Sequence, residues 1–196
     1  MLFATHSKYT LTMKMLSLIL FMHLCSSLHS LNINTSDIKY IRREFNLAID
    51  NEEKANLLFQ ALAKSAPSSN SLQYAYLGAT EALLAKHSFN PLTKMNYVNS
   101  ALNKLNSAVV QNKNDIEIRF MRFSVESELP RYLGMSKHLE EDKNVIIKGL
   151  LKGRTHAEHY SMYKVFANKL YQSKFCNKEE KILLWNLIDT FNTSKS

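Results

Sequence analysis

Apolar residues recur along this chain at steps of three and four positions, the spacing that gathers side chains on one face of an α-helix. The pattern is clearest after Asn90-Pro91, where it continues for about five turns and predicts a helix. The apolar stripe of this helix consists of Leu92, Met95, Val98, Leu102, Leu105 and Val109. We expect Leu102 and Leu105, near its centre, to be core residues.

Seven further segments show the same periodicity, and short polar stretches separate them. They lie near residues 36–49, 52–66, 71–87, 115–130, 136–153, 155–172 and 177–193. Residues that favour helix starts precede several segments: Ser36 or Thr35 for the first, and Asp115 for the segment at 115–130. The last segment carries the apolar residues Ile182, Leu184, Trp185, Ile188 and Phe191. The chain is therefore expected to form about eight amphipathic helices.

Glycine and proline usage supports a helical fold. The chain contains 4 glycines and 3 prolines and has no Asn-Gly or Asp-Gly pair, so the residues that tight β-hairpin turns need are scarce. Short connections leave consecutive helices side by side. We therefore predict an all-α fold of antiparallel helix pairs, arranged as a solenoid or as a compact helical bundle. Gly78, inside a predicted helix, is expected to let a neighbouring helix approach closely.

The N-terminal segment has the composition of an export signal. A lysine-containing start at Met13 precedes about ten apolar residues and then small residues that end at Ser27. The apolar stretch is shorter than the roughly 20 residues that a membrane-spanning helix needs. We predict that residues 1–27 are an N-terminal extension and cleaved signal peptide, that 28–35 form a short linker, and that 36–194 form a single helical domain. Either Met1 or Met13 can be the start.

Cleavage is expected between Leu28 and Leu31, which would leave a periplasmic or secreted protein with no transmembrane anchor. A lipoprotein acylated at Cys25 is the competing interpretation, but the bulky Leu24 precedes that cysteine. If cleavage removes Cys25, Cys176 is the remaining cysteine and no disulfide can form within the chain.

Charge does not favour nucleic acid as a partner. The 25 lysines and arginines exceed the 17 acidic residues and give a net charge of +8. However, most charges alternate in sign along the chain, as in Arg42-Arg43-Glu44, which is typical of a solvated helix face. Export would also remove the chain from most nucleic acids.

Three charged residues form the first candidate site. Arg119, Arg122 and Glu126 are spaced by three and four residues and therefore share one face of the predicted helix. Arginine suits bidentate contacts with a carboxylate or phosphate. The simpler interpretation is a surface ion pair between Arg122 and Glu126. Phe120 and Phe123 alternate with the arginines, which places the charged face beside the core.

A second polar cluster surrounds the connection that begins near residue 87. It consists of Lys86, His87, Asn90, Lys94 and Tyr97. Lys94 and Tyr97 are candidate binding residues, although a cluster beside a loop is more often solvated.

No metal site or cofactor is predicted. His156 and His159 are spaced to share one helix face, but no third ligand lies within reach along the sequence. No sequence motif assigns catalytic residues.

Residues 71–111 resemble a tetratricopeptide-like helix pair. Tyr74, Leu77 and Gly78 match the first helix of that repeat, and Ala101, Leu105 and Ala108 match the second. The segment between the helices is longer than the repeat allows and the usual proline is absent. The stretch Ala75–Asp142, notably the run Ile116–Ser124 followed by Pro130 and Leu133-Gly134, also resembles a group of uncharacterised exported proteins of the Bacteroidota. These resemblances imply export and a helical, tetratricopeptide-like solenoid, with no known activity.

The sequence therefore predicts a non-enzymatic module that binds an unknown protein or peptide of the cell envelope. The alternative is an enzyme whose active site is assembled only in three dimensions around Arg119, Arg122 and Glu126, with His87 nearby.

Overall fold

The computed structural model describes residues 34–66, 68–153 and 159–193, which form α-helices and connections with no strand. The helices are α2 (Ile38–Ala48), α3 (Glu52–Ser65), α4 (Ser71–His87), α5 (Pro91–Gln111), α6 (Ile116–Glu128), α7 (Leu139–Gly153), α8 (Tyr160–Gln172) and α9 (Lys178–Thr193), with the short 3₁₀ helix η1 (Arg131–Leu133) after α6. The predicted all-α class is confirmed. The predicted signal peptide, most of the linker and His156 lie outside the described residues.

Asparagine and aspartate side chains fix where helices begin. The Oδ1 atoms of Asn51 and Asn70 accept hydrogen bonds from backbone amides in the first turns of α3 and α4, at 2.9 and 3.2 Å. Asn90 and Asp115 do the same for α5 and α6, each from two amides. These caps satisfy amides that lack a partner within the helix.

The predicted cap of the first helix is wrong. Asp37, rather than Thr35 or Ser36, accepts a hydrogen bond from the Lys39 amide at 2.8 Å. The hydroxyl of Ser36 instead donates to Asn34 Oδ1 at 2.6 Å. Because the first helical residue is Ile38, the carboxylate of Asp37 is the side chain in register to cap it.

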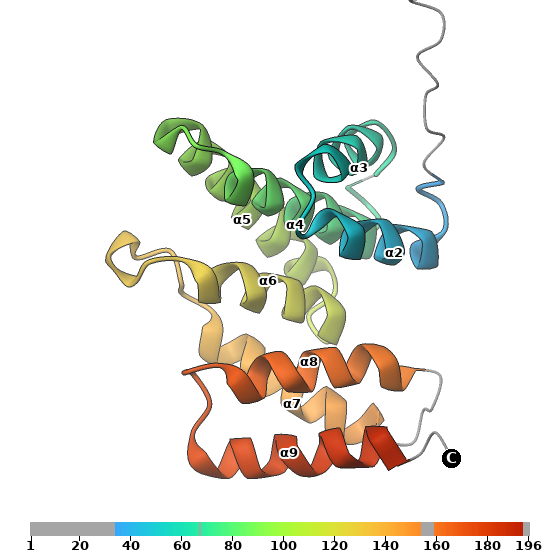
Figure 1. Cartoon of the computed structure of the whole chain (residues 1–196), viewed down its shortest axis with the longest axis vertical. Coiled ribbons are helices and arrows are strands. Elements are labelled where there is room, and N and C mark those ends of the chain that lie inside the picture. Colours follow the sequence, from blue (N-terminus) through green and yellow to red (C-terminus); the bar gives the residue numbers. More distant parts are fainter. Residues whose placement is uncertain (1–33, 67, 154–158, 194–196) are drawn as a thin grey trace, which may run out of the picture. The chain divides into compact units, whose positions relative to one another are not determined.

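Consecutive helices pack against each other throughout the described chain, most extensively α4 with α5 and α8 with α9. Figure 1 shows α8 and α9 side by side and running in opposite directions. Gly78 permits the α4–α5 approach, as predicted, since a Cβ at this position would lie 3.0 Å from the Ala101 carbonyl oxygen and from Lys104 Cβ. Leu102 and Leu105 are buried, which confirms that they are core residues.

Helix α6 is the element that connects the earlier helices with the later ones. It contacts α4 and α5 as well as α7. Its Phe123 belongs to a core cluster that otherwise comes from α7, α8, α9 and the α8–α9 connection. A smaller cluster of Ala85, Val98 and Leu102 lies between α4 and α5.

Three apolar residues of the predicted stripes are exposed. Leu92, in the first turn of α5, is 72% exposed. Ile182 and Trp185 of α9 are 56% and 58% exposed, whereas Leu184 and Ile188 of the same helix are buried. The helix predicted near Ser136 begins later, at Leu139, and the Ser136 hydroxyl donates to the Glu126 carbonyl oxygen at 2.7 Å. None of the described helices is long and apolar enough to cross a membrane.

Candidate functional site

The two arginines predicted to bind a carboxylate bind one that belongs to the chain itself. Arg119 and Arg122 are each 4% exposed, in the interface between α6 and α7, and Asp142 of α7 is fully buried beside them. Arg122 donates from Nε to Asp142 Oδ2 at 2.8 Å and from Nη2 to Oδ1 at 2.7 Å. Arg119 donates from Nη1 to the same Oδ1 at 2.8 Å. This is the bidentate geometry that arginine favours.

Further contacts extend this group over several helices. Arg119 also binds the Glu141 carboxylate at 2.6 Å and the Lys113 carbonyl oxygen at 2.8 Å. Arg122 binds Asn106 of α5 at 3.0 Å. Burial acts to lower the pKa of Arg119, but the hydrogen bonds to Asp142 and Glu141 outweigh it and the pKa is raised. The hydrogen bond from Arg119 lowers the pKa of Glu141.

Glu126 does not pair with Arg122, so the simpler interpretation of a surface ion pair is wrong. Its carboxylate, 1% exposed, accepts a hydrogen bond from the His138 amide at 2.7 Å, and His138 Nδ1 lies 2.7 Å from its other oxygen. Glu126 therefore binds the connection between α6 and α7 at His138. The three predicted site residues share a face, as the spacing indicates, but that face is covered.

A similar buried carboxylate lies at the start of α6. Glu117 accepts hydrogen bonds from Arg42 of α2 at 2.7 Å and from the Tyr76 hydroxyl of α4 at 2.6 Å. Burial raises the pKa of Tyr76, and the neighbouring Glu117 raises it further. Helix α6 thus provides charged groups toward both α2 and α7.

The second predicted cluster is spread over a surface. Lys94 is exposed, whereas Tyr97 is half-buried against Ala85, Val98 and Leu102. Lys86 donates to Asp50 at 2.8 Å and joins the α2–α3 turn to the end of α4. The Nε2 atom of His87 is buried and has no hydrogen-bond partner within the described chain. The structure does not bring this cluster together with Arg119, Arg122 and Glu126 in any described contact.

No group of three histidine, cysteine or acidic residues that could hold a metal ion occurs in the described part of the chain. His159 occupies the N-cap position of α8 without a side-chain capping hydrogen bond, and its ring lies 5.6 Å from that of Tyr163. His156 lies outside the described residues.

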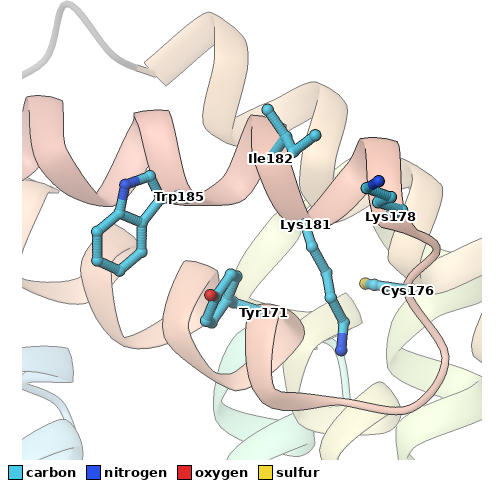
Figure 2. A pocket seen from close by; sticks show the side chains of 6 residues that line it. All are labelled: Tyr171, Cys176, Lys178, Lys181, Ile182 and Trp185. Carbon is cyan, nitrogen blue, oxygen red and sulfur yellow. The ribbon is translucent and has the colours of Figure 1, made fainter.

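A surface that the sequence interpretation missed lies between α8 and α9. It is an open hollow of about 580 Å³, lined by Tyr171, Cys176, Lys178, Lys181, Ile182 and Trp185. Lys178, Lys181, Ile182 and Trp185 belong to α9, Tyr171 belongs to α8 and Cys176 to the connection between them (Figure 2). The rings of Tyr171 and Trp185 lie 5.8 Å apart at an angle of 42°. We name this surface the α8–α9 hollow.

Helical spacing explains how α9 builds this surface. Lys178, Lys181, Ile182 and Trp185 are spaced by three, one and three residues, so they share one face. A second face of the helix carries the buried residues Leu184, Leu187, Ile188 and Phe191. The two faces overlap in sequence, and this overlap makes Ile182 and Trp185 resemble members of the core stripe. The spacing of the two lysines relative to Trp185 is the signal that could have separated the faces.

The thiol in the hollow is poorly suited to nucleophilic chemistry. Burial raises the pKa of Cys176 and so favours the uncharged thiol. The hydroxyl of Ser173 lies 3.8 Å from its Sγ atom. The chemistry that the α8–α9 hollow offers is therefore apolar contact, ring stacking and attraction by two ammonium groups.

Comparisons of the chain with protein families, with curated proteins and with solved structures give no match.

Proposed function

We propose that this chain is an exported, non-enzymatic binding module of the cell envelope, and that the α8–α9 hollow holds an apolar part of a protein or peptide partner. The observation that carries the proposal is the exposure of Trp185, at 58%, beside Tyr171 in the open α8–α9 hollow. Tryptophan and tyrosine are enriched among the residues that dominate binding energies.

The location of the charged residues supports the same assignment. Arg119, Arg122 and Glu126 make their hydrogen bonds to other parts of the chain at the α5–α6–α7 junction. No described feature favours the alternative enzyme, since these groups are used in holding helices together. Trp185 and Ile182, in contrast, make an apolar surface that folding leaves uncovered.

Affinity capture from an envelope extract tests the proposal. We expect proteins or peptides that the wild-type domain retains to be lost from Trp185→Ala. Val165→Ala is the matched control, because Val165 is an exposed apolar residue of α8 that does not line the hollow. Retention of the same partners by Trp185→Ala and wild type, with both folded by circular dichroism, would contradict the proposal.

The proposal of export has a separate test. N-terminal sequencing of the protein recovered outside the cytoplasm should give a first residue between Leu28 and Leu31. A mature chain that begins at a lipid-modified Cys25 would instead make it a membrane-anchored protein.

A further inference from the structure

Two lysines at one end of the α8–α9 hollow, Lys178 and Lys181, have no ion-pair partner among the described residues. Lys174 Nζ and the guanidinium of Arg131 lie 5.4 and 5.9 Å from the centre of the Phe175 ring, next to the hollow residue Cys176. These two cations also lack an ion pair within the described ranges.

The nearby carboxylates do not balance this charge. Glu180 is bound by Lys143 of α7 at 2.9 Å. Burial acts to raise the pKa of Glu180, but the hydrogen bonds from Lys143 and the Asn177 amide, together with the charge of Lys143, lower it overall. Glu179, which is exposed, is the one other acidic residue in the first turn of α9. Lys143 is shared with Glu140 at 2.8 Å, and the exposed Asp189 lies one turn beyond Trp185 on α9. The excess of positive charge is therefore confined to the end of the hollow that Lys178 and Lys181 line.

The apolar and charged parts of the hollow lie at a defined separation. Lys178 and Trp185 are seven residues apart on α9, a rise of about 10 Å. An extended peptide covers that length in about three residues. A ligand that inserts an apolar side chain beside Trp185 and Tyr171 would thus bring a residue about three positions away in its sequence to the two lysines.

We propose that the partner segment is an acidic peptide, in which carboxylates lie about three residues from an aromatic or aliphatic anchor. The anchor stacks on Trp185 and contacts Ile182, and the carboxylates approach Lys178 and Lys181. This inference rests on the proposed function, because it specifies the occupant of the same hollow. It favours a peptide over a lipid surface because the aromatic pair lines a concave site between two helices, with the lysines at one end.

The chain provides its own reporter for the test, since Trp185 is the only tryptophan in the sequence. The probe is a ten-residue peptide, blocked at both ends and free of tryptophan and tyrosine, with an Asp-Glu pair three residues before a Phe-Leu pair. A matched peptide carries Asn-Gln in place of Asp-Glu. We expect both to shift Trp185 emission to shorter wavelength, and the acidic peptide to bind about tenfold more tightly at low salt. The difference should shrink at high ionic strength because salt screens exposed charges.

Charge-neutral variants locate the effect. Replacing both lysines, as Lys178→Gln with Lys181→Gln, should bring the affinity for the acidic peptide down to that for the Asn-Gln peptide, so that the preference is lost. The control is Lys54→Gln with Lys64→Gln, which removes two exposed lysines from α3 and should keep the preference.

Several outcomes would overturn the inference. Equal affinity for the two peptides would refute the acidic partner while leaving the proposed binding function in place. Tighter binding to vesicles of phosphatidylcholine with phosphatidylglycerol, or to a single-stranded oligonucleotide, than to the acidic peptide would identify a different class of partner. Absence of any Trp185 response, together with unchanged partner capture by Trp185→Ala, would refute the proposed function itself.

Discussion

Asp142 is a single residue on which the contact between α6 and α7 depends. It is fully buried, and its two oxygens accept three hydrogen bonds from Arg119 and Arg122. A buried ion pair adds little stability compared with well-packed apolar residues, but removing one partner leaves the other charge buried without compensation. The ion pairs of Asp142 with Arg119 and Arg122 are therefore more important for keeping α6 and α7 in register than their net contribution to the free energy of folding suggests.

We predict that Asp142→Ala lowers the free energy of unfolding by about 3 to 5 kcal/mol, because two arginines lose their buried acceptor. Urea denaturation followed by circular dichroism measures the change. The control is Glu141→Ala, whose carboxylate is 55% exposed, and which should cost less than about 1 kcal/mol. Equal effects of the two substitutions would show that Asp142 has no special structural role.

Leu105 provides a second prediction at this scale. Its side chain is fully buried between α4 and α5, beside the position where Gly78 allows close approach. Leu105→Ala should lower the free energy of unfolding by about 2 to 5 kcal/mol, since it removes apolar contacts and leaves a cavity. Val110→Ala, on the exposed side of the same helix, should change it by less than about 0.5 kcal/mol. Denaturation of both variants compares the two positions.

The spacing of single residues predicted which side chains share a face, but not what covers that face. Arg119, Arg122 and Glu126 lie together because steps of three and four fix this in any helix. Their partners Asp142 and His138 belong to α7 or its approach, and no local rule connects them with α6. Whether the face is exposed depends on this packing, so the sequence left open whether the arginines bind an external carboxylate or an internal one.

At the scale of helices, local chemistry was the most informative part of the sequence. A cap such as Asp115 acts on amides two or three residues ahead, so the start of α6 could be predicted without tertiary structure, whereas the predicted cap of α2 and start of α7 were wrong. The α8–α9 hollow could not be predicted from the sequence. Predicting it requires knowing which of two adjacent faces of α9 packs on the core. Trp185 looked like a core residue in the linear pattern and lies outside the core in the structure.

Helix α7 approaches α6 closely at Gly149. A Cβ at this position would overlap the Cγ2 methyl of Ile116 and lie 3.3 Å from Ile116 Cβ. We therefore expect Gly149→Ala to be destabilising by about 1 to 3 kcal/mol despite alanine's higher helix propensity.

The double variant Gly149→Ala with Ile116→Ala tests this cause. Truncating Ile116 removes the overlapping methyl, so the Gly149→Ala substitution should cost less in that background than in the wild type. Thermal melting of the wild type, the two single variants and the double variant gives the coupling energy between positions 116 and 149. Additive effects would mean that the two positions do not meet.

For the whole molecule, ion pairs predict how stability depends on pH. Arg119 lowers the pKa of Glu141, and Lys143 lowers that of Glu180, below the ordinary value of 4.5. A carboxylate with a lowered pKa in the folded state contributes stability above its unfolded pKa, and this contribution is lost as the pH falls through its folded pKa. Burial raises the pKa of Asp115, so this carboxyl group has the opposite effect and favours the folded state more as the pH falls.

We expect the melting temperature to be nearly constant from pH 7 to about pH 5 and to fall below about pH 4.5, as these carboxylates become protonated. Circular dichroism melts in buffers of constant ionic strength measure it. The variant Glu141→Gln with Glu180→Gln should start from a lower melting temperature at pH 7 and lose less on acidification. A variant that loses as much as the wild type would assign the acid sensitivity to other groups.

The position of α6 also limits how the chain can be shortened or divided. Glu117 binds side chains of α2 and α4, whereas Arg119 and Arg122 bind Asp142 of α7. A chain divided after α6 would leave Arg119 and Arg122 in one fragment and Asp142 in the other, and a chain divided before α6 would separate Glu117 from Arg42. Neither division leaves a fragment with a complete set of charges, so the two complementary fragments are expected to reassociate when expressed separately rather than to persist as independent domains.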